Sequence, residues 1–182
     1  METELAKRKP MRLKCFDYSQ TGAYFVTICT SDRQCILSDI IRSHPVVNNK
    51  SQVGEGLAPP AYTIKLKPCG KIAEEQLYLL NKRYPEVSVS DYVIMPDHIH
   101  IIFHIQKSSG GASPSPTLSN VVCTFKSLTS RIYKQRFEID KVFQRSFAEH
   151  IIRDRDDYET RRKYIYENPM RWYQNHSPDT KN

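Results

Sequence analysis

A run rich in Ile, Val and Phe over residues 92–104 contains His98 and His100. β-branched and aromatic side chains favour strands, so we expect this run to form a strand. Side chains two apart in a strand point to the same face, and two neighbouring imidazoles can hold one metal ion between them. Ile99 and Ile101 would then point the opposite way, into a core. The alternative interpretation is a pair of half-buried histidines with local hydrogen-bond partners.

Two other residues of this run bear on the interpretation. Pro96 cannot donate a ladder hydrogen bond, so we expect a bulge or a sheet edge there, just before the histidines. His104 shares the face of His98 and His100. It lies about 13 Å from His100, at roughly 3.3 Å per residue, and we therefore do not expect it to bind the same ion.

The rest of the chain predicts a single domain over residues 1–182 in which strands and helices alternate. Hydrophobic spacing defines the elements, and stretches rich in Gly, Pro and Ser separate them. The expected parts are a basic arm (1–11), a strand (22–30), a loop insertion (43–62), a short strand (62–66), a helix (71–83), the histidine strand, a flexible linker (107–116), a helix (118–137), a short strand or extended segment (143–152) and a helix (156–167) ended by Pro169. This order is typical of an α+β fold with a small, mainly antiparallel sheet.

The charge of the chain indicates a polyanion as partner. The net charge is +7, and the last third interleaves Lys and Arg with Tyr, Phe and Trp. Cations contact phosphates and aromatic rings stack on unpaired bases, so the mixture suits single-stranded nucleic acid. The alternative is a solvated basic face over ordinary core aromatics. The residues that we expect to contact DNA are Lys126, Arg131, Arg145, Arg153, Lys163 and, beside the arm, Arg12.

Other features bear on location. The five cysteines form no Cys-x-x-Cys pair, which fits reduced thiols in a cytoplasm better than disulfides or a cysteine-based zinc site. The chain has no apolar run of about 18 residues that would span a membrane, and its N-terminus lacks the apolar stretch of a secretory signal. We therefore expect a cytoplasmic protein without a membrane partner.

A second group of polar residues lies near the C-terminus. Tyr164 and Asn168 are four apart on the last predicted helix, so they share one helical face, although Pro169 biases Asn168 out of the helix. A tyrosine hydroxyl, with a pKa of about 10, is a poor nucleophile unless a metal ion polarises its electrophile. A carboxamide oxygen can bind a hard divalent cation beside two imidazoles. The alternatives are a tyrosine at a core edge and an asparagine that caps a turn.

Four blocks of the sequence together resemble one protein family. The string Tyr92-Val-Ile-Met-Pro-Asp-His-Ile-His100 resembles the His-hydrophobe-His (HUH) motif of single-tyrosine transposases. Residues 17–30, 143–153 and 164–172 resemble the first strand and the downstream blocks of the REP-associated tyrosine transposases, which are relatives of the insertion-sequence transposases. The resemblance extends from about residue 12 to residue 172 and is interrupted only by the predicted loop and linker.

The resemblance implies a ferredoxin-like sandwich, with an antiparallel sheet and helices on one face. It implies that His98, His100 and Asn168 bind Mg²⁺ or Mn²⁺ and that Tyr164 is the nucleophile. The implied reaction cuts single-stranded DNA beside palindromic hairpin repeats through a 5′-phosphotyrosine intermediate, then rejoins it. Tyr166 is the main rival nucleophile and Tyr158 a weaker one. Because Tyr166 lies about 200° around the helix from Tyr164, both cannot face the metal.

The resemblance also implies partners and leaves alternatives. The partner would be single-stranded or hairpin DNA, the protein a monomer or a homodimer, and its location cytoplasmic, at the nucleoid. A histidine-triad nucleotide hydrolase is disfavoured, because Ile102 takes the place of a third histidine. A regulator that binds hairpin DNA with the same fold but without catalysis remains the alternative function.

Overall fold

The computed structural model describes residues 21–43, 61–106 and 116–176. The predicted basic arm, most of the predicted loop insertion (44–60) and most of the predicted linker (107–115) lie outside these ranges, and so does Arg12. The elements are β1 (Gly22–Cys29), the 3₁₀ turn η1 (Ser31–Arg33), β2 (Ser38–Ser43), β3 (Ala61–Leu66), α1 (Pro68–Arg83), β4 (Val87–Ile94), β5 (His98–Ile105), α2 (Leu118–Phe137), β6 (Ala148–Ile152) and α3 (Arg155–His176). In the described part of the chain, no helix is both long enough and apolar enough to cross a bilayer.

Four strands form an antiparallel sheet in the order β4-β5-β1-β6. Together with α1 and α2 they follow the chain order β-α-β-β-α-β, which is the ferredoxin-like topology. β2 and β3 pair as a separate hairpin inserted between β1 and α1. The α+β class and the antiparallel sheet are therefore confirmed.

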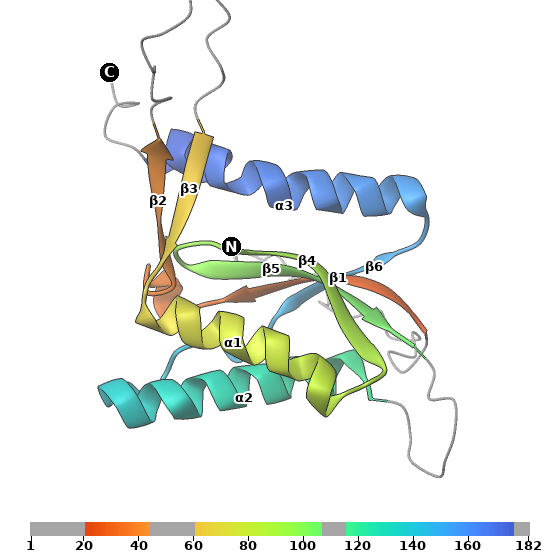
Figure 1. The fold of residues 1–182 in the computed structure, drawn as a ribbon, viewed down its shortest axis with the longest axis horizontal. Coiled ribbons are helices and arrows are strands. Elements are labelled where there is room, and N and C mark those ends of the chain that lie inside the picture. The colour runs from red at the N-terminus through yellow and green to blue at the C-terminus, as the bar shows by residue number, and fades with distance from the viewer. Residues whose placement is uncertain (1–20, 44–60, 107–115, 177–182) are drawn as a thin grey trace, which may run out of the picture.

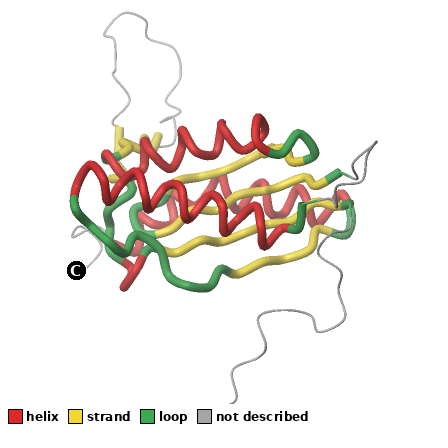
Figure 2. The backbone as a smooth tube through the Cα atoms, turned by 90° about the horizontal axis from the view of Figure 1, so that it is seen from below, coloured by secondary structure: helices red, strands yellow, loops and turns green. Residues whose placement is uncertain are grey.

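The helices occupy both faces of the sheet. α1 and α2 pack side by side below it, and α3 crosses above it (Figure 1). Seen from the side of α1 and α2, the helices lie over the sheet and run broadly along the strands (Figure 2). The expectation that helices cover only one face was therefore incomplete. It holds for α1 and α2, whereas α3 covers the opposite face.

The predicted histidine strand is a hairpin rather than one strand. β4 ends at Ile94 and β5 begins at His98, and the amide of Met95 donates to the carbonyl of His98 at 2.8 Å to close the turn. Pro96 lies in this turn, where its missing N–H costs no ladder bond. The irregularity expected at Pro96 lies earlier instead, between Val89 and Asp91 on β4.

β5 is a central strand that is covered on both faces. Ile99 and Ile101 pack with α1 and α2 in the larger core, as predicted. Ile102 points the other way and joins Phe25 and Ile165 in a second core beneath α3. Because both faces are covered, almost every residue of β5 is buried, so the strand cannot show the polar alternation of a half-exposed strand.

The last helix is longer than predicted. α3 runs to His176, and Pro169 lies inside it. A proline in a helix interior removes one hydrogen bond and costs about 3 kcal/mol. Here Pro169 is buried and Trp172, in the next turn, packs against the second core. Their burial offsets the loss, so Asn168 stays in helical geometry instead of leaving the helix.

Gly70 lies where α1 approaches the chain before β2. A Cβ atom at Gly70 would lie 2.0 Å from the carbonyl oxygen of Leu37, which cannot move as a side-chain tip would. We expect Gly70→Ala to lower the free energy of unfolding by about 1–3 kcal/mol or more, as overpacking does. At Gly22 the nearest atoms are 3.7 Å away, so Gly22→Ala should change the free energy by less than about 0.5 kcal/mol. Urea unfolding of both variants tests the difference, and equal effects would contradict it.

Candidate active site

β5 presents His98 and His100 to the face of the sheet that α3 covers. Their ring centroids are 4.5 Å apart, and the residues are 8% and 4% exposed. The strand lies between β1 and β4, so the backbone that carries the pair is fixed by hydrogen bonds on both sides. The two imidazoles are therefore held on a rigid floor, in the arrangement predicted for one strand face.

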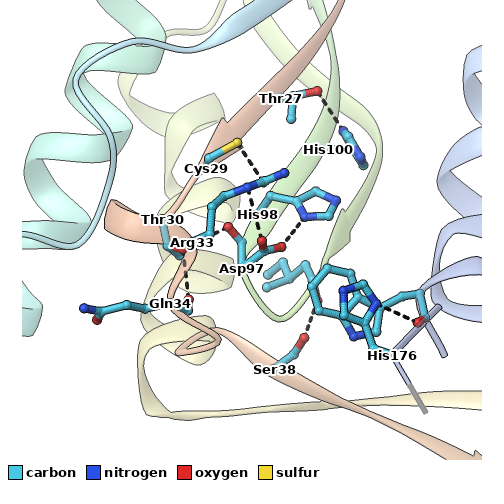
Figure 3. Close-up of polar contacts among 12 residues, drawn as sticks. Thr27, Cys29, Thr30, Arg33, Gln34, Ser38, Asp97, His98, His100 and His176 are labelled. Carbon is cyan, nitrogen blue, oxygen red and sulfur yellow. Dashed lines mark hydrogen bonds and ion pairs between the residues drawn. The ribbon is translucent and has the colours of Figure 1, made fainter. Parts of the chain in front are cut away.

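Each histidine has a hydrogen-bond partner on Nδ1 (Figure 3). Asp97 Oδ1 lies 2.5 Å from Nδ1 of His98, and because a carboxylate can only accept, Nδ1–H of His98 donates. Thr27 Oγ1 lies 2.8 Å from Nδ1 of His100, which is the residue that Thr27 faces in the register of β1 and β5. Partners of this kind fix the ring orientation and leave Nε2 as the ring atom that could bind a metal ion.

Burial keeps both rings neutral near pH 7. Burial lowers the pKa of His100 to about 3, and electrostatic interactions with His98 and Arg33 act in the same direction. Burial also lowers the pKa of His98, although the hydrogen bond that His98 donates to Asp97 opposes this shift. A neutral imidazole retains the lone pair that a metal ion requires.

α3 brings the second half of the predicted site over these rings. The Asn168 side chain is buried, and its hydrogen-bonding interaction with His98 acts to raise the pKa of that histidine, against the effect of burial. The Tyr164 ring lies 5.1 Å from the His100 ring, centroid to centroid. Phe25 stacks on His100 at 5.1 Å and meets Tyr164 edge-on at 6.0 Å. The structure thus brings together all four residues that the sequence singled out.

The residues present fit a divalent metal ion. Nε2 of His100 is buried without a hydrogen-bond partner in the described residues, and such an orphaned ring nitrogen calls for a ligand. Within the same ranges no group of three His, Cys, Asp or Glu residues could hold an ion. The third donor beside His98 and His100 would be the amide oxygen of Asn168. Two imidazoles and one amide oxygen suit Mn²⁺ or Mg²⁺ and leave further positions for substrate oxygens.

Two other tyrosines of α3, Tyr158 and Tyr166, are directed to Asp91 on β4. The Tyr158 hydroxyl donates to its Oδ2 at 2.9 Å and the Tyr166 hydroxyl to its Oδ1 at 3.2 Å. Arg162 Nε lies 3.3 Å from the same Oδ1. Residues 158, 162 and 166 form one stripe along the helix, so Asp91 anchors α3 to the sheet and leaves Tyr164 on the side of the histidines.

We expect Asp91→Ala to destabilise the protein by about 1–3 kcal/mol, because three donors lose their acceptor. Burial raises the pKa of Asp91, but the hydrogen bonds from Tyr158, Tyr166, Ser90 and Arg162 outweigh it and the net pKa is lowered. Because the pKa of Asp91 is lower in the folded state, the ionised carboxylate stabilises the fold at pH values above its unfolded-state pKa of about 4. This stabilisation is lost as the pH falls through the folded-state pKa. Urea unfolding at pH 7 and near pH 3 measures this. A difference between wild type and variant that does not shrink at the lower pH contradicts the assignment.

The predicted DNA-contacting residues are spread over both faces of the protein. Lys126 donates to the carbonyls of Gln144 at 2.6 Å and Arg145 at 2.9 Å, so its ammonium holds a loop. Arg131 is exposed on α2, on the opposite face of the sheet from α3. Neither lies beside the histidines, and their contact with DNA stays a prediction.

Three of the residues predicted to contact DNA are exposed to solvent and lie nearer to α3. Arg145 and Arg153 are exposed, in the segment before β6 and between β6 and α3. Lys163 precedes Tyr164 and lies 3.6 Å from Glu167. Of these, Lys163 is the residue next to Tyr164 in the sequence.

Sequence reasoning missed four residues around the site. Asp97, Thr27 and Phe25 support the histidine rings, and the Trp172 ring lies 5.9 Å from that of His98. Asp97 stands in the HUH string, but a residue adjacent to His98 in one strand would point to the other face. The partners on β1 could be found only from the pairing of β1 with β5.

Known proteins match this chain in sequence and in fold. Residues 73–168, just over half of the chain, match the family described as Transposase IS200 like, and this range includes both histidines, Tyr164 and Asn168. An uncharacterized protein of Haemophilus influenzae is 28% identical over 182 residues, covering 92% of this chain and 91% of its own. A REP-associated tyrosine transposase, solved bound to a REP hairpin, shares the fold with a TM-score of 0.55 at 18% identity, covering 89% of this chain and 74% of its own. The resemblance noted in the sequence is thereby confirmed, and the chain belongs to the IS200-like transposase family.

Proposed function

We propose that this protein is a metal-dependent transposase of single-stranded DNA, which cuts and rejoins strands beside palindromic hairpins through a 5′-phosphotyrosine. The observation that carries the proposal is the proximity of Tyr164 to His100, with ring centroids 5.1 Å apart, beside a buried imidazole nitrogen without a partner. Membership of a transposase family supports a DNA-processing role.

Tyr164 would act as the nucleophile. Its hydroxyl oxygen attacks the phosphorus of a phosphodiester, and the new oxygen–phosphorus bond forms as the bond to the 3′-oxygen breaks. The tyrosine proton passes to water, to which the 36% exposed Tyr164 is open, and the 3′-oxygen takes a proton from water as it leaves as a hydroxyl. One phosphoester bond replaces another, so the bond energy is retained in the phosphotyrosine. A 3′-hydroxyl can therefore reverse the step and rejoin DNA without an energy source.

The chain's own residues would orient the reactants. His98, His100 and Asn168 would hold Mg²⁺ or Mn²⁺, which would polarise the phosphate and offset the charge that develops on it. Asp97 and Thr27 keep the two rings turned so that Nε2 faces α3. Asp91 sets the position of α3 on the sheet, so that Tyr164 is presented to the histidines rather than to the edge of the sheet.

The proposed substrate is a hairpin with a single-stranded flank. The fold is shared with a transposase that was solved bound to a REP hairpin, which supports this class of DNA. The excess of positive charge provides a general attraction for the phosphate backbone. Exposed aromatic side chains such as Tyr166 could stack on unpaired bases of the flank.

A covalent-adduct assay tests the proposal. Hairpin oligonucleotides with labelled single-stranded flanks are incubated with the protein and Mn²⁺, or with EDTA, and separated under denaturing conditions. We expect a labelled protein band only with Mn²⁺, and mass spectrometry should place the nucleotide on Tyr164. Tight binding of the hairpins without an adduct from any flank would instead support the alternative, a non-catalytic regulator with this fold.

A further inference from the structure

The turn after β1 holds a basic residue in an unfavourable backbone conformation. Asp32 and Arg33 both have positive φ, 53° and 56°, although neither is a glycine. Such residues persist only where the surroundings fix them, and they concentrate at functional sites. We asked what this turn places beside the histidines.

Hydrogen bonds fix the turn to the segment that precedes His98. The amide and the hydroxyl of Thr30 both donate to the carbonyl of Asp97, each at 2.9 Å. The amide of Ser31 donates to the carbonyl of Val142 at 2.8 Å. The strained turn therefore keeps a fixed position relative to the β4–β5 hairpin.

The guanidinium of Arg33 lies beside the histidine pair (Figure 3). Its Nε lies 3.3 Å from Oδ2 of Asp97. The other carboxylate oxygen of Asp97, Oδ1, accepts a hydrogen bond from His98. Nη1 of Arg33 donates to the sulfur of Cys29 at 3.1 Å. A guanidinium has five N–H donors, so these two contacts leave donors available, and the side chain is 55% exposed. One carboxylate thus orients both a proposed metal ligand and an open cation.

We propose that Arg33 binds a non-bridging oxygen of the phosphodiester that Tyr164 attacks. The inference rests on the proposed function and adds a residue to it. Arginine suits a phosphate because its planar donors match two oxygens, and Asp97 holds that plane in place. A fixed cation of this kind stabilises the charge that develops on the phosphate in the transition state. Arg33 would be a substrate-binding residue, and Asp97 would position it.

A thermodynamic cycle isolates the contact from catalysis. Binding is measured in the Tyr164→Phe background without metal, with an oligonucleotide that carries either the normal phosphodiester or a neutral methylphosphonate at the cleavage position mapped for wild type. With Arg33 present, we expect the methylphosphonate to weaken binding about tenfold, as the loss of one charged hydrogen bond does. With Arg33→Gln the two oligonucleotides should bind equally. An equal loss with and without Arg33 overturns the proposal.

Cleavage and metal binding give two further readouts. We expect Arg33→Gln to lower the single-turnover rate about 10²-fold with saturating DNA and Mn²⁺, and Mn²⁺ affinity to be unchanged. Arg83→Gln is the matched control, because it removes the same charge from an exposed position on α1, across the sheet. Equal cleavage rates for the two variants, or a loss of Mn²⁺ affinity in Arg33→Gln, would overturn the proposal that Arg33 binds the phosphodiester. Failure of the proposed function is distinguishable, because wild type itself would then form no adduct.

Discussion

Replacing Tyr164 by Phe should remove the covalent DNA adduct while leaving the fold intact. Phenylalanine keeps the ring that contacts His100 and Phe25 but lacks the attacking oxygen. Removal of a nucleophile lowers turnover by as much as about 10⁶-fold, so the adduct should fall at least about 10³-fold, below detection on a gel. The side chain is at the surface, and the free energy of unfolding should change by less than about 0.5 kcal/mol. The two measurements are adduct yield with Mn²⁺ and urea unfolding.

Tyr166→Phe is the matched control on the same helix. Its hydroxyl donates to Asp91 at 3.2 Å, so the variant should lose about 0.5–1.5 kcal/mol of stability. It should still form the adduct. An adduct that persists in Tyr164→Phe, or one that disappears only in Tyr166→Phe, would show that the nucleophile is misassigned. Hairpin affinity should be the same in both variants, because neither change removes a charge.

The elements that could be predicted from the sequence are those that local signals specify, such as a periodic apolar stripe or a capping residue. The helix Leu118–Phe137 has a long apolar stripe and a Thr117 side chain that accepts from the amide of Asn120. For the helix Arg155–His176, local rules give proline a fixed cost, so the sequence predicts an end before Pro169 although the helix continues to His176. The gain that offsets this cost comes from packing Trp172 against the sheet, which is a tertiary effect. β2 was missed for a related reason, since its six residues pair with a strand that lies beyond residues 44–60.

The candidate site divides in the same way. His98 and His100 share a face by strand geometry, and Tyr164 and Asn168 share one by helix geometry, so each half was visible in the sequence. Only the resemblance to a family joined the halves. The supporting residues depend on contacts between distant segments: Thr27 meets His100 through strand register, and Arg33 reaches Asp97 through a turn with positive φ. No local pattern encodes these contacts.

Replacing His100 by Ala should remove metal binding together with adduct formation. Loss of a residue that only supports a metal ligand lowers affinity about 10–100-fold, so loss of a ligand should lower Mn²⁺ affinity by more than about 100-fold. Wild type should be stabilised by Mn²⁺ by about 2.7 kcal/mol at 100 times its dissociation constant, because the ion binds only the folded state. His100→Ala should show no such gain at the same concentration. Calorimetric titration and thermal unfolding with and without Mn²⁺ measure these effects independently of DNA.

His104→Ala is the control on the same strand and the same face. Nε2 of His104 lies 3.2 Å from the hydroxyl of Ser90, and its ring lies 5.8 Å from that of Tyr158, away from Tyr164. The variant should bind Mn²⁺ as wild type does and should retain the adduct. If both variants lose the metal-dependent stabilisation equally, the ion is not held where His98 and His100 meet α3. If His100→Ala keeps that stabilisation, the unpartnered nitrogen of His100 has another role, and the activation proposed for Tyr164 loses its basis.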